Sequence, residues 1–205
     1  MPQSVEEKVL GKIRKGGKGW AFSPKDFLHL GSRKSVDMAL SRLTEKSAIR
    51  RVIRGIYDSP RHSDLLGCEM GPDLDQVAKA LARKFGWRIQ PSGAVAANFI
   101  GLSTQVPSQY LYQSDGPDRS YEIGSTELTF KHAALKEFGF KADESAVVVQ
   151  ALKHLGEDHL SDEVIQQTRD WLKPDQRQRV LKDTERVTGW VYEAIRKVCR
   201  EDSDG

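Results

Sequence analysis

The stretch from Phe22 to Asp58 constrains the fold of this 205-residue chain more than any other. A helix start is predicted at Ser23-Pro24, because a serine cap followed by a proline in the first turn is typical of one. Gly31 permits a tight turn after that short helix. Two β-prone runs that meet at Arg54-Gly55 then predict a hairpin. The order helix, turn, helix and hairpin is that of a winged helix-turn-helix domain.

The second helix of this stretch, predicted from about Arg33 to Lys46, has an apolar side and a polar side. At about 100° per residue, one side collects the apolar residues and the opposite side collects polar ones. The apolar side consists of Val36, Ala39, Leu40 and Leu43. The opposite side carries Lys34, Asp37, Met38 and Ser41, with Ser35 and Arg42 on its flank.

These polar positions are candidate contacts to double-stranded DNA, because a recognition helix reads bases from its amino-terminal turns. The predicted DNA-binding residues on the helix are Arg33, Lys34, Ser35, Asp37, Ser41 and Arg42. In or beside the hairpin, Arg50, Arg51 and Arg54 are expected to contact phosphates or the minor groove. The alternative is a small winged domain that makes protein contacts and whose charges are merely solvated.

The distribution of charge favours the DNA interpretation. Residues 1–62 hold 14 Lys and Arg against 6 Asp and Glu, a net charge of +8. Residues 63–205 hold 18 against 23, a net charge of −5. A split of this kind points to a polyanionic partner for the first part and a different partner for the second.

The chain is predicted to contain two domains and to be α+β overall. The winged helix-turn-helix domain occupies residues 1–62, with a first helix over about residues 4–15, and a linker follows from Arg61 to Pro72. Residues 63–205 form the second domain, which is an α+β core over about residues 73–140 followed by helices over about residues 144–200. The last five residues, 201–205, are expected to fray.

The sequence offers little support for an enzyme and none for a metal or a cofactor. An enzyme would need a cleft with convergent titratable groups in residues 73–200, with the winged part as a targeting module. The sequence contains no GxSxG, HExxH, P-loop or Rossmann pattern. Cys68 and Cys199 follow no metal-binding or disulfide spacing and suit a reducing cytoplasm. No apolar run has the length of a membrane span, and the amino end lacks a signal peptide's apolar region. We therefore expect a soluble cytoplasmic protein with no membrane partner.

Two groups of residues, taken in series, resemble the AbiEi-type antitoxins, which regulate type IV (abortive infection) toxin–antitoxin operons. The first group comprises Phe22, Phe27, Gly31-Ser32-Arg33, Val36, Ala39-Leu40-Ser41-Arg42-Leu43, Ile49-Arg50-Arg51, Arg54-Gly55-Ile56-Tyr57 and Pro60. The second comprises Ile89-Gln90-Pro91-Ser92-Gly93, Ala96-Ala97-Asn98 and Gly101-Leu102-Ser103-Thr104. The resemblance covers about residues 5–140 and does not extend over the helical end.

This resemblance implies a DNA-binding transcriptional autorepressor that is also an antitoxin. The first domain would bind operator DNA, and the second would antagonise a nucleotidyltransferase-like toxin encoded beside it, whether or not the two proteins touch. Only the DNA-binding role maps onto residues, namely Arg33, Lys34, Ser35, Ser41, Arg42, Arg50, Arg51 and Arg54. The alternative is a ligand- or partner-responsive winged-helix regulator that is unrelated to toxins.

Overall fold

The computed structural model describes residues 3–103, 109–133 and 139–200, and these form two compact units. One unit comprises residues 1–87 with 121–128, and the other comprises residues 88–120 with 129–205. Helices and strands occur in both, so the predicted α+β class is confirmed. Thr104, which the resemblance included, and residues 201–205, which were expected to fray, lie outside the described residues.

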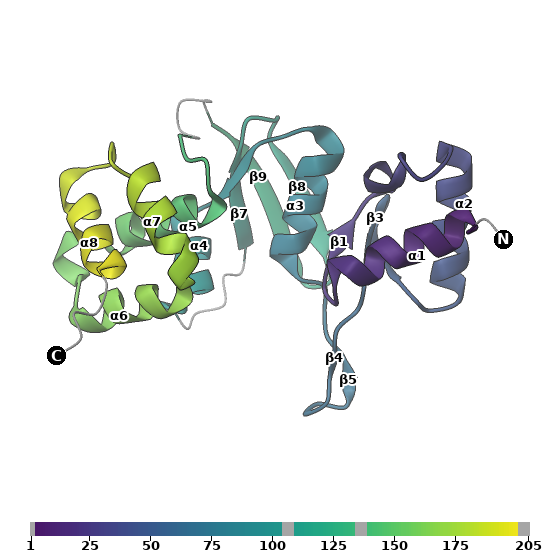
Figure 1. The fold of residues 1–205 in the computed structure, drawn as a ribbon, viewed down its shortest axis with the longest axis horizontal. Coiled ribbons are helices and arrows are strands. Elements are labelled where there is room, and N and C mark those ends of the chain that lie inside the picture. The colour runs from purple at the N-terminus through teal and green to yellow at the C-terminus, as the bar shows by residue number, and fades with distance from the viewer. Residues whose placement is uncertain (1–2, 104–108, 134–138, 201–205) are drawn as a thin grey trace. The chain divides into compact units, whose positions relative to one another are not determined.

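Residues 3–87, which we call the head, begin with a capped helix. Helix α1 (Val5–Gly16) starts at Ser4, whose hydroxyl oxygen accepts a hydrogen bond from the Glu7 amide while the Glu7 carboxylate accepts one from the Ser4 amide. This reciprocal capping satisfies two amides that the helix itself leaves unpaired. Helix α1 lies across α2 (Arg33–Glu45), and the two are in contact (Figure 1).

A three-stranded antiparallel sheet completes the first part of the head. Its strands are β1 (Ala21–Phe22), β2 (Arg50–Ile53) and β3 (Ile56–Asp58), in the order β1-β3-β2. The core between the helices and this sheet consists of Val9, Ile13, Phe22, Phe27, Val36, Ala39, Leu40, Leu43 and Ile49. The elements predicted over residues 4–15, 33–46 and 49–57 are therefore present.

The short helix predicted after Ser23 is a single 3-10 segment, η1 (Pro24–Phe27). The segment η1 is short because the chain turns at Gly31, directly before Ser32 caps α2. A Cβ atom at Gly31 would lie 3.0 Å from the Val5 side chain, a tight contact that Val5 could relieve only by moving a few tenths of an ångström.

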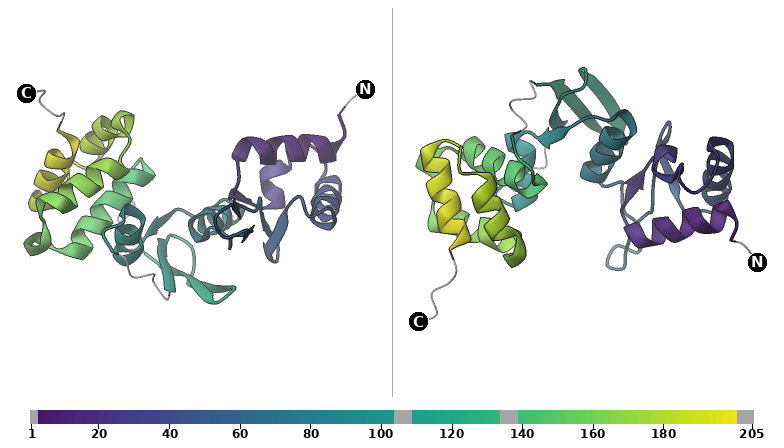
Figure 2. Two further views of the ribbon diagram at one scale, coloured as in Figure 1. Left: turned by 90° about the horizontal axis from the view of Figure 1, so that it is seen from below. Right: turned by 45° about the horizontal axis from the view of Figure 1, so that its top comes forward.

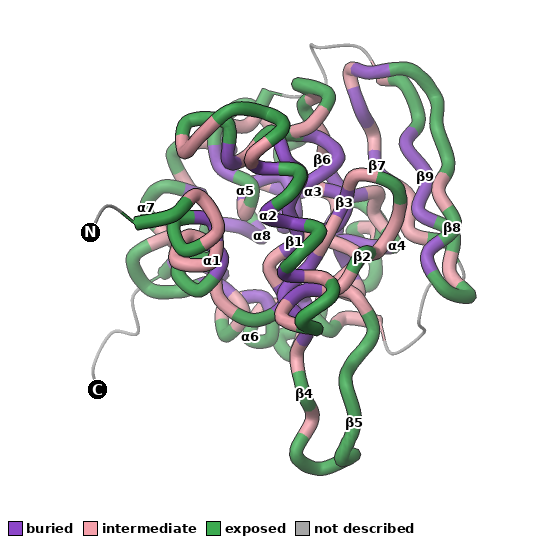
Figure 3. The backbone as a smooth tube through the Cα atoms, turned by 90° about the vertical axis from the view of Figure 1, so that its right-hand side faces the viewer, coloured by how far each residue is buried: buried purple, intermediate pink, exposed green. Residues whose placement is uncertain are grey.

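The predicted linker, residues 61–72, contains a small hairpin of its own. Strands β4 (His62–Ser63) and β5 (Cys68–Glu69) pair in antiparallel fashion. The tip residue Leu65 is 94% exposed, and Figure 3 shows the hairpin as largely exposed chain. After the hairpin, helix α3 (Leu74–Phe85) packs on β1, β3 and η1. The division into residues 1–62 and 63–205 stays a prediction, and α3 belongs to the first compact unit.

The remaining strands form one sheet in the order β6-β7-β9-β8. These are β6 (Ile89–Pro91), β7 (Gln109–Ser114), β8 (Arg119–Ile123) and β9 (Thr126–His132). Strands β6 and β7 pair antiparallel, with Gln90 opposite Gln113. The three strand-like runs predicted between residues 109 and 132 are confirmed.

Helices make up the rest of the second unit. They are α4 (Gly93–Ile100), α5 (Asp143–Leu155), the 3-10 segment η3 (Glu157–His159), α6 (Asp162–Trp171), α7 (Pro174–Asp183) and α8 (Gly189–Cys199). Their apolar faces share one core, in which Val148, Leu152 and Ile195 are fully buried. Figure 2 shows α5–α8, coloured green to yellow, gathered around it. None of the described helices combines the length and apolar character needed to cross a membrane.

Candidate functional site

Helix α2 presents its predicted polar side to solvent. Val36, Ala39, Leu40 and Leu43 are buried, as the helical spacing predicted. Lys34, Asp37, Met38 and Ser41 are all exposed. The helix is capped at its amino end by Ser32, whose hydroxyl oxygen accepts a hydrogen bond from the Ser35 amide. The local sequence thus fixes both the start of α2 and the face that it turns outward.

Four of the predicted side chains on α2, those of Arg33, Ser35, Asp37 and Ser41, interact with neighbours on the same helix or its cap. The Arg33 guanidinium lies 2.8 Å from the Asp37 carboxylate, and both side chains are exposed. The Ser35 hydroxyl lies 2.8 Å from that of Ser32, and the Ser41 hydroxyl donates to Glu45. Exposed contacts of this kind contribute little free energy. A ligand that offers better acceptors can therefore replace them.

Glu6 of α1 forms ion pairs with two cationic side chains at the carboxyl end of α2. Its carboxylate lies 2.5 Å from the Lys46 ammonium and 3.7 Å from the Arg42 guanidinium. The hydrogen bond from Lys46, helped by the charges of both cations and opposed by partial burial, holds the pKa of Glu6 below its ordinary value. No local pattern in the sequence signals this contact, because Lys46 and Glu6 are 40 positions apart.

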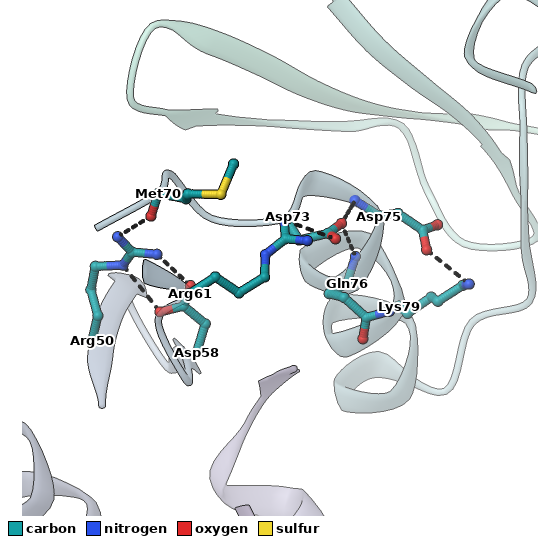
Figure 4. A network of polar contacts seen from close by, with 8 residues as sticks. All are labelled: Arg50, Asp58, Arg61, Met70, Asp73, Asp75, Gln76 and Lys79. Carbon is teal, nitrogen blue, oxygen red and sulfur yellow. Dashed lines mark hydrogen bonds and ion pairs between the residues drawn. The ribbon is translucent and has the colours of Figure 1, made fainter. Parts of the chain in front are cut away.

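Arg50, predicted as a DNA contact, also has a structural role within the head. Its Nε and Nη2 atoms donate to the two carboxylate oxygens of Asp58, at 3.1 and 2.6 Å, and Nη1 donates to the Met70 carbonyl (Figure 4). Asp58 is 1% exposed and Arg50 is 28% exposed. A bidentate pair around a buried carboxylate is a strong contact. All three guanidinium nitrogens therefore have partners inside the protein.

Arg51 and Arg54, by contrast, point into solvent. Both are exposed, and neither they nor Lys34 make an ion pair within the described part of the chain. Arg54 precedes Gly55, whose φ of +77° suits glycine and forms the tight turn between β2 and β3. Among the residues predicted to bind DNA, those without an ion pair in the described part of the chain thus include Lys34 on the outer face of α2, Arg51 in β2 and Arg54 at the β2–β3 turn.

Polar contacts also bind α3 to the first part of the head. The Arg83 guanidinium donates to the Asp26 carboxylate at 2.9 Å and to the Ala21 carbonyl at 2.7 Å. The Arg61 guanidinium lies 3.4 Å from the carboxylate of Asp73, the residue that caps α3 (Figure 4). Local patterns in the sequence gave no signal for these contacts, since the Arg83 contacts span about 60 positions.

The described residues contain few side chains that are suited to metal binding or to nucleophilic catalysis. Among the described residues, no group of three or more His, Cys, Asp or Glu side chains could hold a metal ion. Cys199 is buried, and burial raises the pKa of its thiol, although nearby Arg177 and Arg169 oppose this. Cys68 is exposed on the β4–β5 hairpin.

The sequence matches one family model. A model of the family DUF6088, described as a family of unknown function, matches residues 8–180. No curated protein matches the sequence. The crystal structure of the RV2827C protein from Mycobacterium tuberculosis is similar over 95% of this chain and 76% of that chain, with 11% sequence identity and a TM-score of 0.41. A similarity at this level supports no inference about fold or function.

Proposed function

We propose that this chain, which belongs to the DUF6088 family of unknown function, is a transcriptional regulator whose head binds double-stranded DNA. The observation that carries the proposal is the exposure of Lys34, Arg51 and Arg54, which make no ion pair within the described part of the chain. Positive charge that is left unpaired on one helix face and one hairpin suits a phosphate backbone.

The order of elements in the head supports a winged helix-turn-helix assignment. Helix α1, strand β1, the short η1, helix α2 and the β2–β3 hairpin follow one another, and the sheet order is β1-β3-β2. In such a domain, η1 and α2 would be the helix-turn-helix pair, and the hairpin would be the wing. The buried side of α2 holds it on the core, which leaves its outer face for the major groove.

The intramolecular ion pairs on this surface are compatible with DNA binding. Arg33 pairs with Asp37, and Arg42 pairs with Glu6, but both arginine side chains are exposed. Because an exposed ion pair contributes about 0–1 kcal/mol, exchange of a carboxylate for a phosphate costs little. These arginines would therefore join Lys34, Arg51 and Arg54 when DNA is bound. Arg50, with its bidentate contact to Asp58, would remain within the head.

For the biological role, we propose an autorepressor and antitoxin of a type IV toxin–antitoxin operon, acting in the cytoplasm against a nucleotidyltransferase-like toxin. The support is the resemblance to AbiEi-type antitoxins at residues of both the winged segment and the segment after it. The charge of the chain agrees with two separate partners, since residues 63–205 carry a net charge of −5. DNA binding is thus assigned to residues 1–62 of the head, and antagonism of the toxin to residues 63–205.

A gel-shift titration with the upstream region of the protein's own operon tests the DNA assignment. Affinity is expected to fall steeply with salt, since each neutralised phosphate releases about 0.9 counterion. Arg54→Ala is expected to weaken binding to all sequences alike, whereas Lys34→Ala or Ser35→Ala is expected to change the preference among sequences. A folded protein that retards no DNA at low salt would refute the assignment.

Co-expression with the neighbouring gene tests the antitoxin role. The full-length protein and a Lys34→Ala/Arg51→Ala variant are compared for rescue of growth. Rescue by both would assign antagonism to residues outside the DNA-binding surface, and rescue only by the wild type would assign it to repression. Rescue by neither, or a metabolic gene in place of a nucleotidyltransferase gene, would favour a ligand- or partner-responsive regulator instead.

A further inference from the structure

An apolar side chain, that of Met38, lies on the polar outer face of helix α2. Met38 is 47% exposed, and the other exposed side chains of α2 are all polar or charged. We propose that Met38 contacts the C5-methyl group of a thymine in the major groove of the operator, so that the protein prefers thymine at that position. The inference rests on the proposed function of the head and adds to it a residue that determines specificity.

The geometry of the helix keeps Met38 out of the core of the head. Val36 and Leu40 are fully buried, and at about 100° per residue Met38 lies about 160° around the helix from each of them. A partner molecule is therefore needed to remove its side chain from water. Exposed apolar residues are common on proteins, so exposure alone identifies no partner. The surroundings of Met38 identify one.

The neighbours of Met38 on the helix surface are polar. Residues three and four positions apart lie beside one another on an α-helix. For Met38 these are Lys34 and Ser35 in the preceding turn, and Ser41 and Arg42 in the following turn. Lys34 and Arg42 are both exposed, and Lys34 makes no ion pair within the described part of the chain. Met38 is thus a small apolar spot with a cationic side chain one turn to either side.

The major groove of DNA offers a surface that matches this arrangement. There an adenine–thymine pair presents an apolar methyl group beside hydrogen-bond acceptors, namely the thymine O4 and the adenine N7. An apolar protein surface that covered Met38 would also remove Lys34 and Arg42 from water without supplying acceptors, which is unfavourable. The mixture of apolar and cationic groups therefore favours DNA over an apolar protein partner.

The place of Met38 within α2 suits contact with a base. Helix α2 begins at Arg33, so Met38 lies in its second turn, and a recognition helix reads bases from its amino-terminal turns. A methionine side chain is unbranched and has three rotatable bonds, so its terminal methyl group can adjust to a base edge. Met38 should therefore add specificity, whereas Arg54 of the hairpin should add affinity for every sequence.

Single replacements of thymine by uracil in an operator duplex test the inference, because uracil lacks the methyl group but keeps the acceptor O4. At the thymine that Met38 contacts, uracil should lower the affinity of the full-length wild type about fourfold in a gel shift, as expected for the burial of one methyl group. Met38→Ala should bind the thymine and uracil duplexes alike at that position. Met38→Leu, which keeps a large apolar side chain, should retain the preference for thymine.

The matched control is Met70→Ala, which shortens an exposed methionine that lies outside α2. Met70 follows strand β5 and is 41% exposed. Its contact with Arg50 uses the Met70 carbonyl, which alanine keeps. Met70→Ala should therefore show the same sensitivity to uracil as the wild type. If Met38→Ala does not fold, Met38→Gln, which has a similar length and helix propensity, carries the test with the same expectation.

The outcomes separate this inference from the proposed function. If at no thymine does uracil weaken the wild type more than Met38→Ala, at equal melting temperatures, the inference is overturned while DNA binding stands. Dissociation of a wild-type dimer by Met38→Ala, measured by sedimentation, would also overturn it, because Met38 would then lie between two copies of the chain. A wild type that binds no DNA at low salt would instead refute the proposed function.

Discussion

The head and the helical part of the second unit both contain many arginines, but they place them differently. In the second unit, Arg169 of α6 donates to the carbonyls of Lys197 and Val198 at the end of α8, and Arg179 of α7 pairs with Glu144 of α5. In the head, Arg51 and Arg54 point into solvent with no ion pair in the described chain. Arg169 and Arg179 thus join helices of the second unit, whereas Arg51 and Arg54 of the head are available to a partner.

Two adjacent arginines of strand β2, in the head, show the same contrast. Arg50 binds buried Asp58, while Arg51 is exposed. A uniform register from the Ile53–Ile56 pair would place Arg51 opposite Asp58. An irregularity between Arg51 and Ile53 instead pairs Arg50 with Asp58 and Arg51 with Tyr57. A one-residue shift of this kind exchanges the faces of a strand, and it decides here which arginine is structural and which is available.

The largest expected effect is on stability, from Arg50→Ala. Loss of the guanidinium leaves the Asp58 carboxylate buried without its counter-charge and should lower the free energy of unfolding by roughly 2–4 kcal/mol. Denaturant titration measures this change. Arg51→Ala is the matched control, with an expected change within about 0.5 kcal/mol. Equal losses for the two variants would show that the two arginines have the same role.

A smaller loss of stability is expected from Arg169→Ala in the second unit. The variant removes two charge-assisted hydrogen bonds to the last carbonyls of α8, and the free energy of unfolding should fall by about 1–2 kcal/mol. The affinity for DNA should not change. Thermal melting and gel shift together check both statements, and reduced DNA affinity in the folded variant would contradict the contrast between the two units.

The third effect concerns binding rather than stability. Arg51→Ala should lower the affinity for every DNA sequence by about fivefold to tenfold near 0.1 M salt, through the loss of one phosphate contact. Arg179→Ala, in the second unit, removes the same charge and serves as control. Unchanged affinity for Arg51→Ala would mean that the β2–β3 hairpin does not contact DNA.

The smallest effect is an expected gain in DNA affinity, which Glu6→Gln should produce. Without the carboxylate, Arg42 and Lys46 are released, and DNA affinity should rise about twofold to threefold. Because the pKa of Glu6 is lowered in the folded protein, its carboxylate stays charged from about pH 5 upward, and its contribution to stability is lost only as pH falls through that lowered pKa. The ratio of the DNA affinity of Glu6→Gln to that of the wild type should therefore be the same at about pH 5.5 and about pH 7.5. A fall in affinity would place Glu6 among the DNA contacts.

The elements of the fold could be predicted from the sequence because their signals are local. The spacing of Val36, Ala39, Leu40 and Leu43 predicted the buried side of α2, and Ser32 predicted its start. The hairpin at Gly55 was also predicted, but its irregular register was not. For α3 the helix was predicted and its packing was not, since Arg83 finds Asp26 57 residues away.

The sequence by itself determined where helices and strands form and which helical faces are apolar, because caps, turns and periodicity act over a few residues. Only the tertiary structure decided which cations are used within the protein and which face solvent. That choice depends on where carboxylates such as Asp58, Asp26 and Glu6 come to lie, and a carboxylate pairs with whichever cation the packed chain brings closest.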